Sequence, residues 1–206
     1  MRDEETGTWW QQVSGKAAFG ALKGRTLEPV LSDELTFGLW KGESPAGQVL
    51  APVAAYEKKY ESDWEPKVAK LPTVIDFPEE GLQSRSVVFG MEISGESRAY
   101  PQSVLKPGSP LQDRLHGTPI LLVVGPDNKA VRAFISQLDK SGIEFFQKAG
   151  EAQWSLVDST SGSEWNFEGC AVSGASKGKC LARVPLLKDY WFDWRNYHPQ
   201  TSIFHR

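Results

Sequence analysis

The chain contains two cysteines, Cys170 and Cys180, and these are the residues whose chemistry is easiest to name. They flank Gly174–Gly178 almost symmetrically, and a glycine-bounded segment of this kind is typical of a hairpin turn. Opposed residues on antiparallel strands have Cβ atoms about 4.5–5.5 Å apart, slightly wider than the roughly 3.8 Å of a disulfide. The spacing allows either a cross-strand disulfide, with some local adjustment, or two free thiols. A zinc site needs further ligands, so we predict none here.

Three polar residues, Glu96, Arg98 and Tyr100, alternate along a hairpin that we predict over residues 86–101. Residues two apart on a strand project from the same face. If that face lines a groove, it offers a ligand a guanidinium cation and a phenol. The alternative interpretation is that it is the solvent face of an edge hairpin.

Lys177 lies in the glycine-framed loop between the cysteines, and Lys23 lies in a similar loop near the N-terminus. A lysine ammonium together with loop N–H groups can bind an anion, and the alternative is a solvated side chain. Trp165 is one of eight tryptophans in the chain. Such a residue either fills the core or, if exposed, forms an aromatic platform for a sugar.

The three histidines, His116, His198 and His205, do not neighbour a nucleophile and an orienting carboxylate in the sequence. Nucleophilic catalysis requires that arrangement. We therefore predict no catalytic residue, no cofactor and no metal, and we expect the ligand-binding candidates to meet an unidentified small molecule or protein.

The elements that must position these side chains occur twice. Residues 7–30 and 162–184 share glycine, tryptophan, lysine and leucine at matched positions. The matched pairs include Asp3 and Asp158, Gly7 and Gly162, Trp10 and Trp165, Gly15 and Gly169, Gly20 and Gly174, Lys23 and Lys177, Leu27 and Leu181, and Val30 and Val184. Such self-similarity predicts an internal repeat. Lys16 and Thr26 stand where the second copy has its cysteines, so the hairpin does not require a disulfide.

The pattern of turns and apolar runs predicts about ten to twelve short strands and few helices. We expect a mainly β to α+β fold, with an antiparallel, hairpin-rich sheet or barrel-like units. We divide the chain into residues 1–50, the C-terminal half of a first unit; residues 51–82, a helical segment with a proline-rich linker; and residues 83–206, a complete second unit. In the middle part, Tyr56, Tyr60 and Trp64 are spaced to share one helical face.

Composition excludes some classes of function. The formal net charge is −3, which argues against nucleic acid as a partner because that binding depends on clustered lysine and arginine. The sequence has no apolar run of the roughly 20 residues that span a bilayer. Residues 1–7 have no apolar stretch of the kind found in a signal peptide.

Several motifs together resemble a known family. They are Met1-x-Asp3-x-x-Thr6-Gly7-x-x-Trp10, then Gly15-x-Ala17-x-x-Gly20-x-x-Lys23-Gly24-x-x-Leu27, then Tyr56-Glu-Lys-Lys-Tyr60, and Val88-Phe-Gly-Met-Glu-Ile-Ser-Gly95-Glu-Ser-Arg98-Ala99-Tyr100-Pro101. This order resembles prokaryotic proteins grouped as domain of unknown function 3179. The resemblance covers nearly the whole chain and implies half a unit followed by a whole one, so we expect residue 1 to fall in the middle of a unit.

The family pattern has a Cys-Pro-x-Cys turn after its central apolar strand, where this chain has Gly125-Pro126-Asp127-Asn128. Two thiolates at that spacing form a redox disulfide or hold a soft metal, whereas glycine and asparagine do neither. The resemblance thus implies a unit that has lost thiol chemistry. It also implies an extracytoplasmic or cell-envelope location.

These observations favour a non-catalytic structural or ligand-binding module. The alternative is that the chain is the scaffold part of a redox or metal-handling enzyme whose Cys-x-x-Cys site lies upstream of it. A third interpretation is carbohydrate binding through exposed tryptophans.

Overall fold

The computed structural model describes residues 1–28, 30–79, 81–139, 141–148 and 154–206. The described part is mainly β, with short antiparallel hairpins and a few short helices, which confirms the expected fold class. The described strands form five small sheets, and none of these closes into a barrel. One strand pair departs from the antiparallel pattern, because β15 (Ser202–Ile203) runs parallel to β4 (Glu96–Pro101).

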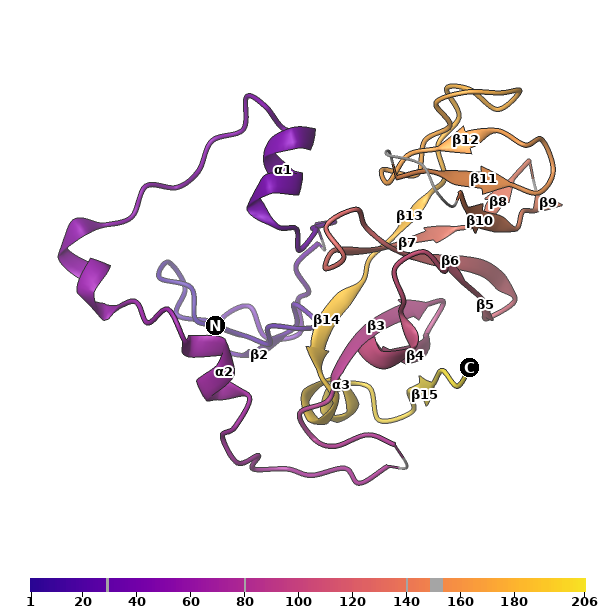
Figure 1. Cartoon of the computed structure of the whole chain (residues 1–206). Coiled ribbons are helices and arrows are strands. Elements are labelled where there is room, and N and C mark those ends of the chain that lie inside the picture. Colours follow the sequence, from indigo (N-terminus) through magenta and orange to yellow (C-terminus); the bar gives the residue numbers. More distant parts are fainter. Residues whose placement is uncertain (29, 80, 140, 149–153) are drawn as a thin grey trace.

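Two four-stranded sheets dominate residues 83–206 (Figure 1). The first has the order β14 (Leu187–Tyr190), β3 (Val87–Ile93), β4 and β15. The second has the order β13 (Arg183–Val184), β7 (Val131–Ile135), β6 (Thr118–Val124) and β5 (Leu111–Leu115). A third sheet contains β10 (Phe145–Gln147), β11 (Leu156–Asp158) and β12 (Glu164–Trp165). Two small ribbons pair β1 (Trp9–Trp10) with β2 (Ala17–Phe19) and β8 (Gln137–Leu138) with β9 (Ser141–Gly142).

The described helices are short. They are α1 (Phe37–Glu43), α2 (Trp64–Val68), α3 (Trp191–Tyr197) and the 3₁₀ turns η1 (Ala54–Lys59) and η2 (Gln102–Val104). Within the described ranges, none of these helices has the length and apolar character needed to cross a membrane.

The apolar run in β6 forms the centre of the core. Its side chains alternate between two clusters, with Leu121 and Val123 in one and Ile120 and Leu122 in the other. Alternate residues of a strand project to opposite faces, so β6 is covered on both sides. This is why the strand reads as a continuous apolar run rather than as an alternating one.

The hairpins at residues 1–28 and 158–184, here called the N-terminal and C-terminal hairpins, share several hydrogen bonds. Trp10 Nε1 donates to Asp3 Oδ2 at 2.8 Å, and Trp165 Nε1 donates to Asp158 Oδ2 at 3.0 Å. The isolated bridge between Lys16 and Thr26 has its counterpart in the bridge between Cys170 and Cys180. The same local sequence signals therefore produce the same local structure twice.

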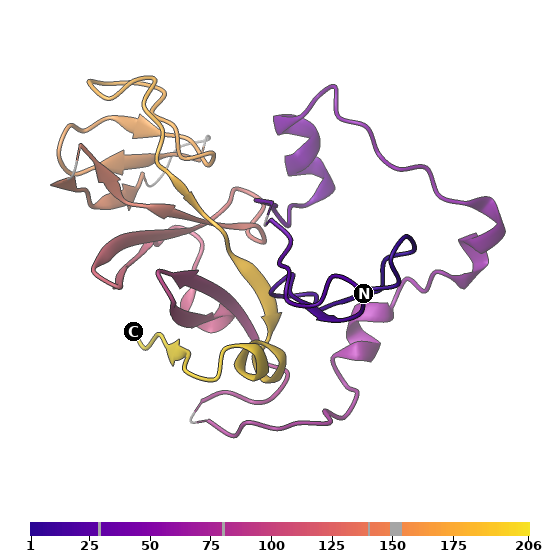
Figure 2. The same cartoon turned by 180° about the vertical axis from the view of Figure 1, so that it is seen from behind.

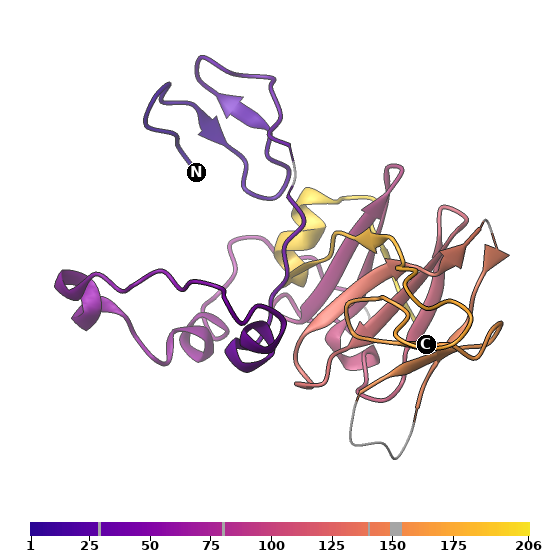
Figure 3. The same ribbon diagram turned by 90° about the horizontal axis from the view of Figure 1, so that it is seen from above.

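The surroundings of the two hairpins differ. Trp165 and Leu181 are buried against Phe134 and Phe145, whereas Leu27, which matches Leu181, is 47% exposed. Phe134 packs so closely on Gly169 that a Cβ there would lie 2.3 Å from the ring. The N-terminal hairpin instead projects away from the two large sheets (Figure 3).

Cys170 and Cys180 form a disulfide, with their Cα atoms 4.0 Å apart. Of the two states that the sequence allowed, this is the one present in the structure. The bond links facing strands of the C-terminal hairpin, and Lys16 and Thr26 show that the same hairpin also forms without it.

Residues 51–82 differ from the single helical face that the spacing predicts. The 3₁₀ turn η1 ends at Lys59, Tyr60 is extended, and α2 begins at Trp64. Tyr56, Tyr60 and Trp64 are 51%, 66% and 61% exposed. An isolated helix this short is marginal unless an apolar face packs against something, and no residue between positions 44 and 70 is buried.

We predict that Cys170→Ala/Cys180→Ala lowers the free energy of unfolding by about 2–3 kcal/mol, because the bond closes a short loop and restricts the unfolded chain. Urea unfolding of oxidised proteins measures the change. The matched control is Lys16→Ala/Thr26→Ala, which we expect to change stability by less than about 0.5 kcal/mol. Equal stability of the cysteine variant and the wild type would contradict the prediction.

Burial of Asp189 in β14 raises the pKa of its carboxyl to about 6, and the nearby charge of Asp193 adds to the rise. The folded protein therefore binds this proton more tightly than the unfolded chain, so stability falls as the pH rises from about 4 through 6. We predict that Asp189→Asn raises the melting temperature at neutral pH but not near pH 4. A benefit of Asp189→Asn that is equal at both pH values would refute the assignment.

Candidate functional site

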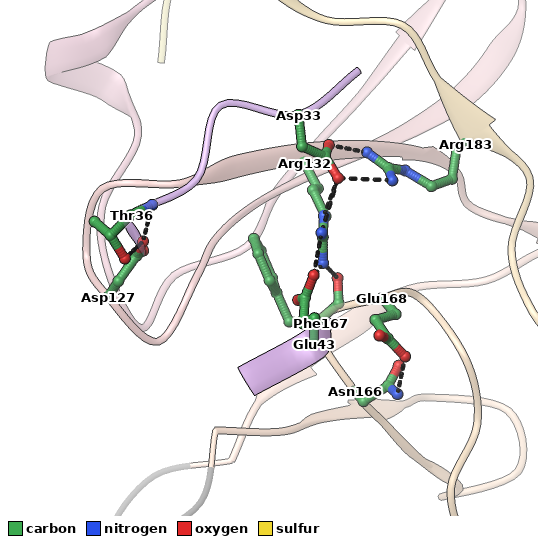
Figure 4. Close-up of polar contacts among 9 residues, drawn as sticks. All are labelled: Asp33, Thr36, Glu43, Asp127, Arg132, Asn166, Phe167, Glu168 and Arg183. Carbon is green, nitrogen blue, oxygen red and sulfur yellow. Dashed lines mark hydrogen bonds and ion pairs between the residues drawn. The ribbon is translucent and has the colours of Figure 1, made fainter. Parts of the chain in front are cut away.

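Arg132 is a buried cation, with a side chain that is only 3% exposed. It lies on β7, paired with Val123 of the central strand β6. Its Nη1 and Nη2 donate to the two carboxylate oxygens of Glu43 at 2.8 and 2.7 Å. Its Nε and Nη2 donate to Asp33 Oδ2 at 3.1 and 2.8 Å. One buried guanidinium thus binds two carboxylates from a distant part of the chain (Figure 4).

The protein wall around Arg132 is aromatic. The guanidinium lies 4.5 Å from the ring centroid of Phe167, and Nη1 also reaches the Phe167 carbonyl at 3.4 Å. Asn166 and Glu168, on either side of Phe167, are hydrogen bonded to each other at 3.2 Å. A buried cation over an aromatic face gains further stabilisation, on the order of 1–2 kcal/mol.

Asp33 is shared between two arginines. Arg183, on β13, donates from Nη1 to Asp33 Oδ2 at 3.0 Å and from Nη2 to Oδ1 (Figure 4). Burial acts to raise the pKa of Asp33, but the hydrogen bonds from Arg183 and Arg132 outweigh it, so the pKa lies below its ordinary value. Asp33 is therefore ionised at neutral pH and acts as a permanent anion of the site.

The segment that carries these carboxylates, residues 33–43 and here called the acidic segment, makes further contacts with residues 83–206. Thr36 Oγ1 donates to Asp127 Oδ2 at 2.8 Å, and its backbone N–H donates to the same oxygen at 3.3 Å. Leu35 and Leu39 pack against the core cluster that contains Phe167. Lys188 forms an ion pair with Glu34.

Asp127 belongs to the turn between β6 and β7. Its Oδ1 accepts the backbone N–H groups of Lys129 and Ala130 at 3.0 and 2.9 Å. Burial acts to raise its pKa, but these hydrogen bonds and those from Thr36 hold the pKa below the ordinary value. The turn therefore presents a fixed carboxylate to the acidic segment.

A small pocket remains beside Asp33, Arg132 and Arg183, with a volume of about 30 Å³. A cavity of this size holds a water molecule or two rather than a substrate. In this structure, Asp33 and Glu43 of the acidic segment occupy the hydrogen-bond donors of Arg132 and Arg183.

The structure places the predicted residues Glu96, Arg98 and Tyr100 in a different cluster. Arg98 Nη1 and the Tyr100 hydroxyl both donate to Asp113 Oδ2, at 2.6 and 2.8 Å. Glu96 lies 3.5 Å from Arg98. Burial, with the hydrogen bond to Asp113, raises the pKa of Tyr100 above its ordinary value.

The interpretation of this face as the solvent face of an edge hairpin is wrong. The strand β4 lies between β3 and β15, and Tyr100 is fully buried and stacks on Phe204. Asp113, which joins the group, was missed because it lies on β5 of the other sheet, and the chain between the two strands carries no signal of their proximity.

Lys177 and Trp165 are not part of either cluster. Lys177 is exposed at the tip of the C-terminal hairpin. Trp165 is fully buried, with its ring edge-on to Phe145 at 5.4 Å. A ring in that position fills the core and has no free face to offer a sugar.

The residues of the Arg132 site were not singled out from the sequence. Asp33 and Arg132 lie 99 positions apart, and Asp33 and Arg183 lie 150 apart. The one signal available was the arginine inside the apolar strand Val131–Ile135, because a buried charge requires a partner.

In the part of the chain that the structure describes, no group of three or more histidine, cysteine, aspartate or glutamate side chains is arranged to hold a metal ion. The carboxylates of the Arg132 site bind guanidinium groups instead.

Comparison with known proteins places this chain in a family. Residues 1–201 match the model described as "Protein of unknown function (DUF3179)". The chain belongs to the DUF3179 family. No curated protein and no solved structure matches it. Within the DUF3179 pattern, the turn Gly125–Asn128 is where the resemblance expects two cysteines, and in this member Asp127 uses that turn to hold Thr36.

We predict that Arg132→Met releases the acidic segment. The loss of hydrogen bonds to charged groups, each worth about 1.5–3 kcal/mol, should speed amide hydrogen exchange in residues 33–43 by about 10- to 100-fold. Exchange in β6 should stay slow, because methionine fits an apolar strand. Hydrogen exchange with mass spectrometry measures both regions.

The matched control is Arg114→Met on β5, where the exposed guanidinium bonds only locally, to the Gly117 carbonyl at 3.1 Å among the described contacts. We expect it to leave exchange in residues 33–43 unchanged. Slow exchange of the acidic segment in Arg132→Met would show that Arg132 does not hold it.

Proposed function

We propose that this protein is a non-catalytic binding and structural module, in which residues 83–206 grip an acidic polypeptide segment through Arg132. The observation that carries the proposal is the buried guanidinium with four hydrogen bonds to Asp33 and Glu43, neither of which belongs to its own unit. The bidentate geometry is the one by which arginine recognises carboxylates most specifically.

Energetics support a binding role. A buried charge with one partner removed is destabilised by about 3–5 kcal/mol, so the Arg132 site strongly favours an anionic occupant. Leu35, just before α1, and Leu39, within α1, add apolar contact with the core. The ion pairs of Arg132 with Asp33 and Glu43 give the site its specificity. Leu35 and Leu39 add apolar surface that is buried on binding.

The same contacts argue against acid–base catalysis at this site. A general acid or base works best with a pKa near the operating pH. The pKa values of Asp33 and Asp127 are held below the ordinary range by their hydrogen-bond partners. The charges of the site are paired with each other and are not poised for proton transfer.

We also propose that residues 1–50 and 83–206 are a half unit and a whole unit of one repeat. The shared hydrogen bonds of the two hairpins support this, and so do α1 and α3, which each end in a bond to a matched tryptophan carbonyl, Ser44 to Trp40 and His198 to Trp194. On this proposal, α3 packs on its own unit while α1 packs on the following one, so the acidic segment couples neighbouring units. The Cys170–Cys180 disulfide supports an oxidising, extracytoplasmic setting.

The test is binding of the segment in trans. We expect a synthetic peptide of residues 31–45 to bind the full chain carrying Asp33→Asn/Glu43→Gln, whose own segment no longer competes for Arg132. Isothermal titration calorimetry should give saturable binding that is at least about tenfold weaker once Arg132→Met is added, because hydrogen bonds to a charged group are lost.

A peptide with asparagine and glutamine in place of its two acidic residues is the control and should bind at least about tenfold more weakly as well. Equal binding of both peptides, or no binding of the acidic one, would contradict the proposed function.

A further inference from the structure

The chain between the acidic segment and the unit that binds it is long and loosely attached. From residue 44 to residue 70 no side chain is buried. Figures 1 and 2 show this stretch as an arc that leaves α1, runs away from the sheets and returns through α2. The chain contacts residues 83–206 again at Leu71, whose carbonyl accepts a hydrogen bond from Arg85. We call residues 44–70 the connecting arc.

The described polar contacts between the acidic segment and residues 83–206 involve side chains at one compact site. They join Asp33 and Glu43 to the two arginines, Thr36 to Asp127, and Glu34 to Lys188. None of them depends on which molecule supplies the segment. The same set can therefore form between two copies of the chain without a change in geometry.

We propose that the acidic segment is exchanged between two copies of this chain, so that Arg132 of each copy binds Asp33 and Glu43 of the other. This inference rests on the proposed function of the Arg132 site. The exchange gives a closed, two-fold dimer in which each copy contributes residues to both sites.

Exposed aromatic side chains on the connecting arc also favour the exchange. Tyr56, Tyr60 and Trp64 lie on it and are 51–66% exposed, so three large aromatic side chains face solvent in the single copy, and covering apolar surface of this kind is favourable. In the exchanged dimer the two arcs cross between the same pair of molecules, which brings these aromatic side chains together. In the single copy, these aromatic side chains stay exposed to solvent.

Chain length sets the concentration dependence. A flexible arc of this length has an end-to-end distance on the order of 30 Å, which gives the intramolecular contact an effective concentration in the millimolar range. We therefore expect the closed single copy in dilute solution, and the exchanged dimer at high concentration or when closure within one chain is blocked.

The first test uses complementary charge reversal in the full chain. One variant carries Asp33→Lys/Glu43→Lys, and the other carries Arg132→Glu/Arg183→Glu. Each alone repels its own segment, whereas a mixture restores opposite charges at both sites. Light scattering after size exclusion should give 22.9 kDa for each variant alone and twice that mass for the equimolar mixture. A mixture that stays at the single-chain mass would overturn the proposal.

The second test leaves Arg132, Arg183 and the two carboxylates that they bind unchanged. Thr36→Cys/Asp127→Cys places two thiols where Thr36 Oγ1 and Asp127 Oδ2 lie 2.8 Å apart, and the native cysteines are already paired. Oxidation at rising protein concentration should convert an internal cross-link into a covalent dimer on non-reducing gels. An internal cross-link at every concentration would refute exchange. If the peptide of residues 31–45 binds but both tests give single chains, the exchange is wrong and the binding site stands.

Discussion

The buried guanidinium of Arg132 is the constraint on which the placement of the N-terminal part depends. Arginine stays charged in proteins, and burying an ion without a partner costs several kcal/mol. Among the described residues of 83–206, Arg132 contacts the carbonyl and the ring of Phe167 but forms no ion pair with a carboxylate. The anions come from Asp33 and Glu43. The acidic segment therefore supplies the counter-charge that residues 83–206 need at Arg132.

The two hairpins distinguish the short-range hydrogen bonds that form a hairpin from the tertiary packing that buries it. They share several internal hydrogen bonds, including the tryptophan-to-aspartate bonds of Trp10 and Trp165. They differ in burial, because the C-terminal hairpin lies on a sheet that supplies Phe134 and Phe145. Turn chemistry and short-range bonds build the hairpin, and the hydrophobic effect acts on it only where apolar surface is available to cover it.

A second charged cluster follows the same rule as the first. Asp113 accepts hydrogen bonds from Arg98 and Tyr100, so that a carboxylate on one sheet holds a cation and a phenol on the other. In both clusters an arginine of one element pairs with a carboxylate of another. In these two clusters, the charges connect elements that lie far apart in the sequence or in different sheets.

The sequence by itself determined the mainly β class and the repeated hairpin signals, because these depend on short-range patterns of turn and apolar residues. It also determined the family, whose motifs recur in a fixed order along nearly the whole chain. It also placed β6 at the centre, since an apolar run of that length must be covered on both faces. Tertiary structure alone decided which charges meet. Asp33 reaches Arg132 across 99 positions, and Asp113 reaches Arg98 from another sheet. Tertiary structure also left residues 53–64 without one helical face, because no surface packs against them. Such pairings depend on which distant segments the fold brings together. Local periodicity in the sequence does not specify these contacts.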